Sequence, residues 1–263
     1  MGKPYILRVS SQKGGVGKTV IATNLAAAIR ALGFKVLIID TDFTNPSVGV
    51  YLGLEDVNLG FREVVTGKVE PLRAIIPHYA TGLSVIPGVI TSKQFQPTKG
   101  QIDTTIRKLQ NLNFDFVIVD TEPGYIIPQE FRMYDEAIII TTPEMSSCMS
   151  AVKLAHIYDR EKLKHSLVVN RVKNKRYEIS IEEIEEIYEN RVEGILPEDE
   201  TVPMSIAQHV PAYTMNRNSN FSKKIREVAR VYSGRADVDE IEERDKPEKW
   251  GFFAFLSRIF HLR

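Results

Sequence analysis

The chain has 263 residues, of which 43% are hydrophobic and 26% are charged, so it can bury a sizeable core and its composition excludes a disordered chain. Its 34 Lys and Arg residues balance its 34 Asp and Glu residues, which argues against a general nucleic-acid or membrane polyelectrolyte. One cysteine, Cys148, excludes an internal disulfide and a cysteine-rich metal or cluster site. The cysteine fits a reducing compartment, the first residues carry no charged-then-apolar signal region, and no window holds the roughly 18 apolar residues that a membrane span needs. We therefore expect a cytoplasmic protein.

Short β-branched segments alternate with longer helical patterns, which is typical of strand-helix-strand units around a mainly parallel sheet. We expect helices over 19–32, around 102–109 and over 181–188, the last beginning at the capping-box pair Ser180 and Glu183. The expected strands are 5–9, 35–39, 83–86, 115–119, 137–140, 166–169 and 192–196. The fold class is therefore α/β, with a mainly parallel sheet flanked by helices.

The composition divides the chain into three parts. Residues 1–232 read as one α/β domain, and 233–248 carry seven acids against three bases, as a linker does. Residues 249–263 contain three bases, no acid and many aromatics, and at about 100° per residue their large apolar side chains fall on one half of a helix. We expect an amphipathic helix that binds an anionic membrane surface and is too short to span it. A helix docked on the core is the alternative.

A glycine-rich loop, residues 12–19, lies between the first expected strand and the first expected helix. Glycines let backbone N–H groups surround phosphate oxygens, Lys18 adds a positive charge near the outer phosphates, and the Thr19 hydroxyl can bind Mg²⁺. The residues expected to bind the nucleotide here are Gly14, Gly15, Val16, Gly17, Lys18 and Thr19.

The loop has Gln12 where the general pattern has Gly, and it has a lysine at position 13. In both respects it resembles the deviant Walker A ATPases of the MinD/ParA family, most closely the MinD branch. The resemblance covers residues 4 to about 232 and the tail. It implies a P-loop ATPase fold, ATP and Mg²⁺ as cofactors, slow and partner-stimulated hydrolysis, and a homodimer that encloses two ATP molecules. Lys13 and Lys18 would act in catalysis, Lys13 by reaching the partner subunit's nucleotide.

Carboxylates follow two expected strands at the edge where an open α/β sheet binds its ligands. By the resemblance, Asp42 orients the attacking water, while Asp40 and Asp120 belong with Thr19 to the Mg²⁺ site. Asp40 and Asp42 could instead cap the loop after their strand. Glu122 stands where the family has Pro or Ala, and its carboxylate either points into solvent or alters hydrolysis.

Two further segments resemble the family's base-binding loops. Asn170 and Arg171 follow an expected strand, and Asn170 matches the residue that reads the adenine edge, unless it only closes the strand. Pro197 and Asp199 lie in a stretch that resembles the second base-contacting loop.

These features predict an ATP-dependent dimer that binds the inner face of the cell membrane reversibly and positions cell-division or other machinery through an unidentified regulatory or cargo protein. One alternative is a ParA-like ATPase that partitions DNA. The neutral net charge disfavours nucleic acid, although residues 171–176 hold four bases. Another is a nucleotide-bound membrane adaptor that hydrolyses little ATP. An iron-sulfur carrier is disfavoured by the single cysteine.

Overall fold

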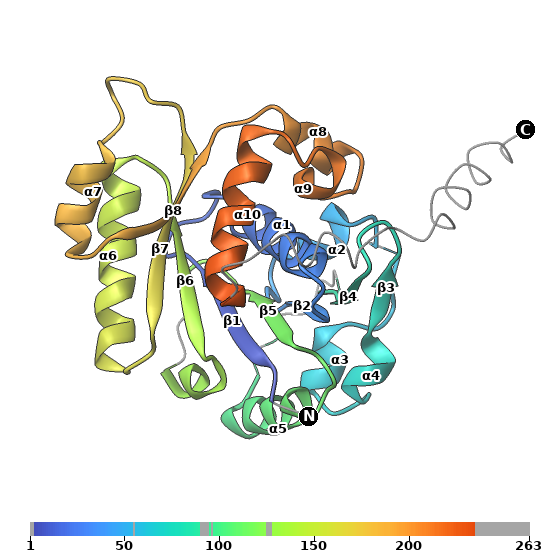
Figure 1. The fold of residues 1–263 in the computed structure, drawn as a ribbon. Coiled ribbons are helices and arrows are strands. Elements are labelled where there is room, and N and C mark those ends of the chain that lie inside the picture. The colour runs from blue at the N-terminus through green and yellow to red at the C-terminus, as the bar shows by residue number, and fades with distance from the viewer. Residues whose placement is uncertain (1–2, 55, 90–94, 96, 125–127, 235–263) are drawn as a thin grey trace, which may run out of the picture.

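The computed structural model describes residues 3–54, 56–89, 95, 97–124 and 128–234 (Figure 1). The predicted membrane helix, 249–263, and all but the first two residues of the predicted linker, 233–248, lie outside the described residues. Within the described ranges, no helix is long and apolar enough to cross a membrane.

The centre of the fold is an eight-stranded sheet in the order β3-β4-β2-β5-β1-β6-β7-β8. All neighbouring strands pair in parallel except β3 and β4, which are antiparallel. The strands are β1 (Tyr5–Ser10), β2 (Val36–Asp40), β3 (Ile76–His78), β4 (Leu83–Ile86), β5 (Phe116–Asp120), β6 (Glu136–Thr141), β7 (His165–Val172) and β8 (Val192–Pro197). The predicted α/β class with a mainly parallel sheet is confirmed.

The seven predicted strands are all present, and β3 is the one that the sequence did not indicate. It has three residues, and Pro77 at its centre cannot donate a backbone hydrogen bond. Such a strand is tolerated here because β3 lies at the edge of the sheet and pairs only with β4.

Helices cover both faces of the sheet, so each central strand is buried on both sides. Along β2, Val36 and Ile38 join one core cluster while Leu37 and Ile39 join the other, as the two-residue period of a strand requires. The first cluster packs under α1 and α10, and the second under α6 and α7 (Figure 1).

The helix predicted around 102–109 is present. Its Leu109 side chain is fully buried, and the side chains of Ile102 and Ile106 lie outside the described residues.

The long helices are α1 (Lys18–Ala31), α5 (Lys99–Gln110), α6 (Met145–Arg160), α7 (Ile181–Tyr188) and α10 (Asn220–Ser233). The shorter ones are α2 (Val48–Tyr51), α3 (Phe61–Val65), α4 (Pro71–Ala74), α8 (Thr201–Ala207), α9 (Ala212–Met215) and a 3₁₀ helix at Pro128–Met133. The predicted start of α7 is confirmed, because the Ser180 hydroxyl accepts from the Glu183 backbone and the Glu183 carboxylate accepts from the Ser180 backbone.

The order of the strands indicates which edge of the sheet binds a ligand. The first strand, β1, lies between β5 and β6, so the chain runs outward from β1 to one side and later returns to continue on the other. The loops that follow β1, β2, β5, β7 and β8 therefore meet at the carboxyl edge of the sheet, beside this reversal point. Every segment that the sequence indicated for nucleotide chemistry lies in the last residues of one of these five strands or in the loop after it. Asn170 and Arg171 lie within β7, which continues beyond the predicted end of its strand at 169.

Candidate nucleotide-binding site

The glycine-rich loop joins β1 to α1 and ends at the amino terminus of that helix. Gly15 and Gly17 adopt positive φ angles of 78° and 95°, which other residues rarely adopt. A side chain at Gly17 would also collide with the amide group of Asn170. No side chain caps the start of α1, so its first N–H groups remain available to an anion, and the helix dipole favours negative charge there.

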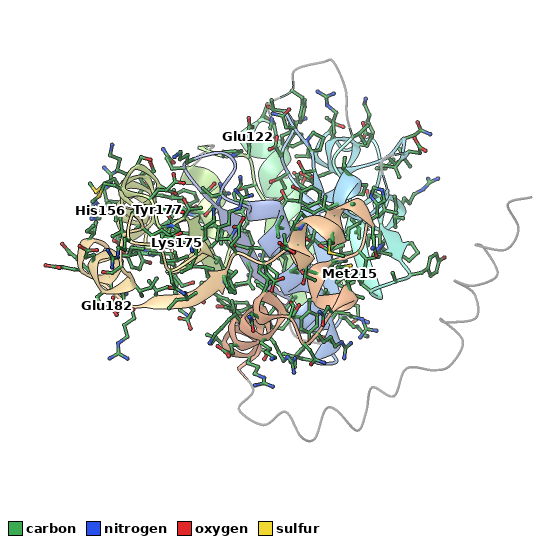
Figure 2. All side chains as sticks on the ribbon, turned by 90° about the horizontal axis from the view of Figure 1, so that it is seen from above. Glu122, His156, Lys175, Tyr177, Glu182 and Met215 are labelled. Carbon is green, nitrogen blue, oxygen red and sulfur yellow. The ribbon has the colours of Figure 1, made fainter. Side chains whose placement is uncertain are left out.

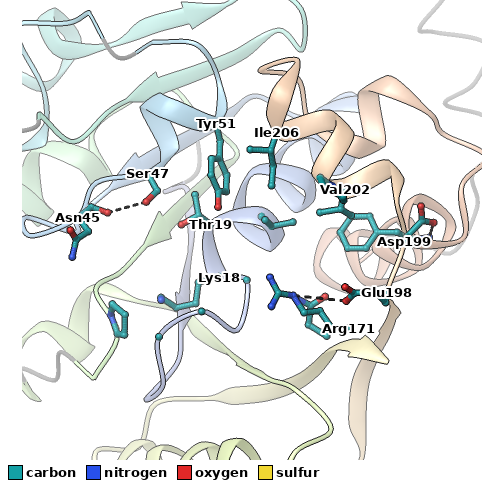
Figure 3. A pocket seen from close by; sticks show the side chains of 18 of the residues that line it. Lys18, Thr19, Asn45, Ser47, Tyr51, Arg171, Glu198, Asp199, Val202 and Ile206 are labelled. Atoms are coloured by element: carbon teal, nitrogen blue, oxygen red, sulfur yellow. Dashed lines mark hydrogen bonds and ion pairs between the residues drawn. The ribbon is translucent and has the colours of Figure 1, made fainter. Parts of the chain in front are cut away.

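A cavity of about 570 Å³ opens beside this loop (Figure 3). Its lining is Gly14, Gly15, Gly17, Lys18, Thr19, Val20, Asp42, Asn45, Ser47, Tyr51, Glu122, Pro123, Asn170, Arg171, Pro197, Glu198, Asp199, Val202, Pro203, Ile206 and Phe221. The structure thus brings together the predicted loop, carboxylate and base-binding segments. Four predicted residues do not line it: Lys13, Val16, Asp40 and Asp120.

Asp120, at the end of β5, lies behind Thr19. The Thr19 hydroxyl donates a 2.5 Å hydrogen bond to Asp120 Oδ2, whereas Asp120 Oδ1 is buried and has no partner among the described residues. Burial raises the pKa of Asp120 to about 6, although the bond from Thr19 and the charge of Lys18 oppose the increase. An unsatisfied carboxylate oxygen next to a threonine hydroxyl fits the oxygen ligands and ligand-bound waters that Mg²⁺ prefers.

Asp40 is also buried, but its carboxylate is occupied by the backbone. Oδ2 accepts from Ser47 N at 2.8 Å and Val48 N at 2.9 Å, and Oδ1 accepts from Asp42 N at 3.0 Å. Burial and the charge of Asp120 raise the pKa of Asp40 to about 8. Asp40 therefore caps the loop after β2. Both carboxylate oxygens of Asp40 already accept hydrogen bonds, whereas Asp120 has one oxygen without a partner among the described residues. In this arrangement Asp40 would therefore contact Mg²⁺ only indirectly.

No group of three or more His, Cys, Asp or Glu side chains in the described ranges could hold a metal ion without other ligands. This is compatible with Mg²⁺, which commonly takes one or two carboxylates together with phosphate oxygens and water.

Asp42 and Glu122 both face the cavity, near Lys18. Asp42 Oδ1 accepts from the backbone of Thr44 and Asn45, which closes a tight turn after β2. Lys18 is 8% exposed; burial lowers the pKa of its ammonium group, and Asp120, Asp42, Asp40 and Glu122 act against this decrease. Glu122 lines the cavity and is partly exposed, and its effect on hydrolysis stays a prediction.

Asn170 lies at the end of β7 and braces the glycine-rich loop. Its Nδ2 donates to the Val16 carbonyl at 2.8 Å, and its side chain is buried against Gly17. The neighbouring Arg171 adopts a positive φ of 60° and points its guanidinium toward Glu198, with 4.0 Å between Nε and Oε2. Asn170 thus contacts both the phosphate loop and the cavity, a double role that the sequence did not indicate.

Pro197 ends β8, and Asp199 follows it at the cavity wall. The Asp199 carboxylate accepts from Thr201 N at 2.9 Å and from Phe221 N at 3.1 Å. It thereby joins the starts of α8 and α10 at the cavity wall. The side-chain oxygens of Asp199 are therefore already hydrogen-bonded to the backbone.

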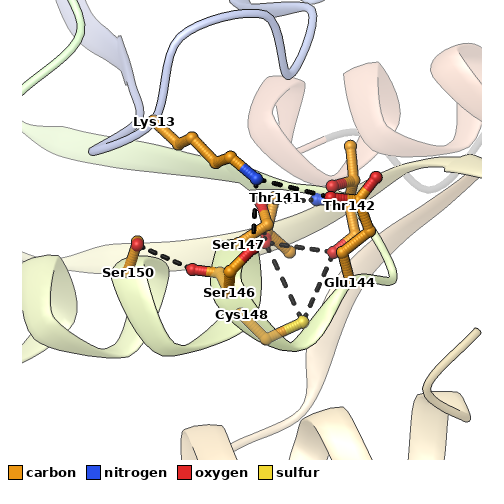
Figure 4. A network of polar contacts seen from close by, with 8 residues as sticks. All are labelled: Lys13, Thr141, Thr142, Glu144, Ser146, Ser147, Cys148 and Ser150. Carbon is orange, nitrogen blue, oxygen red and sulfur yellow. Dashed lines mark hydrogen bonds and ion pairs between the residues drawn. The ribbon is translucent and has the colours of Figure 1, made fainter.

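Lys13 lies outside the cavity and contacts the start of α6 (Figure 4). Its Nζ is 3.1 Å from Ser146 Oγ and 3.4 Å from Glu144 Oε2, and its side chain is 45% exposed. Within one chain the Lys13 ammonium group therefore pairs with Glu144 and does not point into the cavity beside its own loop.

The basic residues at the end of β7 and directly after it are exposed. The Glu178 carboxylate accepts from the backbone of Lys173 and Lys175, and Arg171 faces Glu198. Lys175 and Tyr177 lie on the side of the molecule that carries His156 and Glu182, away from Met215 (Figure 2).

Sequence reasoning missed the apolar end of the cavity. Tyr51 comes from α2, Val202 and Ile206 from α8, and Phe221 from α10. No sequence motif includes these residues. They meet at the cavity only because three helices that are distant in sequence pack close together. The hydrophobic spacing of each helix indicates only that it has a buried face.

The glycine-rich loop lies between a parallel strand and a helix, and Lys18, Thr19 and a strand-end aspartate meet at the carboxyl edge of the sheet. This arrangement defines a P-loop nucleotide-binding protein. The chain belongs to the MinD/ParA family, because residues 7–212 match the family described as "CobQ/CobB/MinD/ParA nucleotide binding domain". The resemblance inferred from the glycine-rich loop is confirmed.

Several curated relatives match most of the chain. The septum site-determining protein MinD of Buchnera aphidicola is 32% identical over 232 residues, which cover 82% of this chain and 86% of the relative. MinD of Bacillus subtilis is 29% identical over 277 residues and covers both chains fully. An uncharacterized ATP-binding protein of Methanocaldococcus jannaschii is 29% identical over 264 residues, covering 98% of this chain and 97% of the relative.

Solved structures support the same fold. The cell division ATPase MinD of Pyrococcus furiosus superposes with a TM-score of 0.81 at 25% identity, covering 89% of this chain and 99% of that one. A ParA family ATPase from Chlorobium tepidum gives a TM-score of 0.75 at 21% identity, covering 86% and 98%, and shows the shared fold alone. The chain is thus a member of a family of P-loop ATPases.

Proposed function

We propose that this chain is a Mg²⁺-dependent ATPase that dimerises when it binds ATP and then binds the membrane through residues 249–263. The observation that carries the nucleotide part is the buried Asp120 oxygen that has no partner among the described residues and lies behind Thr19, which lines the cavity at the glycine-rich loop. Lys18 and the first N–H groups of α1 would bind the phosphates, and Asn170, Pro197 and the backbone near Asp199 the base. Mg²⁺ would neutralise the charge that develops on the transferring phosphoryl group.

The named relatives support this assignment. One similar structure is MinD of Pyrococcus horikoshii complexed with Mg-ADP, and another is a plasmid partition protein of Borrelia burgdorferi bound to AMPPNP. A third is a MinC:MinD cell division protein complex of Aquifex aeolicus. By analogy, this chain would recruit a regulatory or cargo protein while it is dimeric.

Catalysis would depend mainly on positioning. Asp42 faces the cavity on a turn that its own carboxylate closes, so it could orient a water molecule for attack on the terminal phosphate. Lys13 would leave Glu144 and Ser146 and reach the partner subunit's nucleotide. An exposed ion pair of this kind contributes at most about 1 kcal/mol, so its loss opposes dimerisation only weakly.

Membrane binding by the dimer is explained by avidity. A single amphipathic helix of 15 residues binds a bilayer only marginally once the ordering of the peptide is counted. Two helices on one dimer make the second insertion intramolecular, which raises the apparent affinity by a factor on the order of 10² to 10⁴. The protein would be cytoplasmic as a monomer and peripheral at the inner face of the membrane when ATP is bound.

Flotation with anionic liposomes tests this function. We expect the full chain to float with Mg²⁺ and a non-hydrolysed ATP analogue, and to remain in solution with ADP or after removal of residues 249–263. Leu256→Asp and Ser257→Asp form a matched pair, because they add the same charge to opposite halves of the predicted helix. Only Leu256→Asp should abolish flotation. Equal binding with ADP and with the analogue would overturn the nucleotide switch.

Two measurements distinguish the other readings. A salt-dependent DNA mobility shift by the chain lacking 249–263 would favour the ParA-like function, which the shared fold makes worth testing. A single-turnover assay that detects bound ATP but no hydrolysis, in the wild type as in Asp42→Ala, would favour a membrane adaptor.

A further inference from the structure

Tyr51 occupies a distinctive place in the cavity. It is the last residue of α2, the short helix that directly follows the loop of Asp42 and Ser47. Its ring is partly buried and lines the cavity between Thr19 on α1 and Ile206 on α8 (Figure 3). Within the described part of the chain the Tyr51 hydroxyl makes no hydrogen bond, so a polar group enters the cavity without a protein partner.

The backbone that carries Tyr51 is held at both ends. At the start of α2, the buried Asp40 carboxylate accepts from Ser47 N and Val48 N. At its end, the carbonyl of Val50 accepts a 2.8 Å hydrogen bond from His209 Nδ1, in the loop after α8. Because these bonds hold the first residues of α2 and the residue next to Tyr51, the backbone that carries the ring is fixed without help from the Tyr51 hydroxyl.

The close approach of His209 depends on a glycine. Gly53 has a φ of 64°, and an added Cβ there would lie 3.1 Å from Cβ of His209. A larger residue at position 53 would therefore push His209 away from Val50. The contact joins α2, which follows the predicted catalytic loop, to α8, which forms the apolar wall of the cavity.

The Tyr51 hydroxyl is protonated and can act as a hydrogen-bond donor in the cavity. Burial raises the pKa of Tyr51, Asp120 adds to the increase, and Arg171 opposes it. The phenol consequently keeps its proton at neutral pH and is available as a donor.

We propose that Tyr51 contacts the nucleotide and that its hydroxyl donates a hydrogen bond to an oxygen of the bound molecule where the phosphates meet the nucleoside. The bond ties α2, and with it the loop of Asp42 and Ser47, to the bound nucleotide. His209 acts as a positioning residue that keeps Tyr51 over the cavity. The inference rests on the proposed ATP-binding function and adds a contact from a helix that no nucleotide motif includes.

Tyr51→Phe tests the inference, because it removes one oxygen and leaves the ring. We expect the Kd of the full chain for Mg-ADP, measured by calorimetry, to rise about tenfold, which corresponds to about 1.4 kcal/mol. The melting temperature without nucleotide should stay within about 1 °C, because the Tyr51 hydroxyl makes no hydrogen bond to any residue that the structure describes. Tyr79→Phe is the matched control, since Tyr79 is 90% exposed and lies outside the cavity.

The acceptor oxygen is identified with Mg-pyrophosphate as a second ligand. A loss of affinity for both ligands supports the proposal with a phosphate oxygen as acceptor, and a loss for Mg-ADP alone supports it with a ribose oxygen. His209→Ala should weaken Mg-ADP binding in the same direction. His209→Asn should restore it, because the Asn amide can donate from the position of Nδ1 and Asn tolerates a positive φ.

A wild-type Kd for Mg-ADP in Tyr51→Phe would overturn the inference and leave the proposed function intact. Absence of Mg-ADP binding by the wild-type chain itself would instead overturn the proposed function, and the inference with it.

Discussion

The hydroxyl of Thr19 donates a 2.5 Å hydrogen bond to one oxygen of Asp120, while the other oxygen of the same carboxylate is buried without a partner in the described structure. This contact joins the first turn of α1 to the end of β5, which are 101 residues apart in sequence. It holds the two predicted Mg²⁺ groups together and leaves a lone pair for a cation or for a water bound to it.

Asp120→Asn should therefore weaken nucleotide binding only when Mg²⁺ is present. The amide preserves an oxygen for Thr19 but removes the charge that attracts the cation. We expect the Kd for Mg-ADP to rise by about tenfold or more, a loss of about 1.4 kcal/mol. Titrations in excess EDTA provide the control, because wild type and variant should then bind ADP with similar affinity. An equal loss with and without Mg²⁺ would contradict the assignment.

Glu122 faces the cavity near Lys18, where it would repel the phosphates. Glu122→Gln should tighten Mg-ADP binding about fivefold, as expected for the removal of like-charge repulsion of about 1 kcal/mol in a partly screened site. The gain should shrink in high salt. Glu161→Gln, an exposed change at the far end of α6, should leave the Kd unchanged. An unchanged Kd in Glu122→Gln would indicate that this carboxylate turns into solvent.

Lys13 and Glu144 make a test of dimerisation possible without disturbing the cavity. Lys13→Gln should bind ADP normally but fail to dimerise with Mg²⁺ and a non-hydrolysed ATP analogue, as measured by light scattering after size exclusion. Glu144→Gln should instead favour the dimer by up to about fivefold, because the pair it breaks is exposed and weak. Lys153→Gln, also on α6 and exposed, is the control. A dimeric Lys13→Gln would contradict the predicted role.

The sequence predicted the site best where neighbouring residues carry the chemistry. The phosphate loop, Lys18 and Thr19 form one continuous segment, and Asp120 ends a strand that is buried on both faces. The partner of Lys13 at Glu144 and the position of Tyr51 could not be predicted, because both depend on packing between distant elements. The edge strand β3 was missed because three residues around a proline carry no period-two pattern.

Substitutions of Asn170 can separate its two roles, which are the hydrogen bond to the glycine-rich loop and the predicted recognition of adenine. Asn170→Ala removes the bond to the Val16 carbonyl and should lower the free energy of unfolding by about 1–2 kcal/mol. If the same amide reads the adenine edge, as predicted, the affinity for Mg-ADP should fall more than that for Mg-GDP. Calorimetry with both nucleotides measures the ratio. An equal loss for both would leave Asn170 with the bracing role alone.

His78, the last residue of β3, should make the free energy of unfolding depend on pH. Its ring is 7% exposed, and its Nδ1 lies 2.7 Å from Thr81 Oγ1. Burial lowers the pKa of His78 below 6.5, although a hydrogen bond to the His209 backbone opposes this. Below pH 6.5 the unfolded chain therefore binds a proton that the folded chain binds less readily, and the free energy of unfolding should fall as the pH decreases from 7 to 5.

His78→Gln removes this titration, so the variant should lose less stability than the wild type between pH 7 and pH 5. Urea unfolding of the nucleotide-free chain at four pH values measures both slopes, and the difference between them isolates His78 from the carboxylates that also titrate. His156→Gln, an exposed change on α6, should keep the wild-type slope. Parallel slopes for His78→Gln and the wild type would show that the ring takes up its proton as easily in the fold as in the unfolded chain.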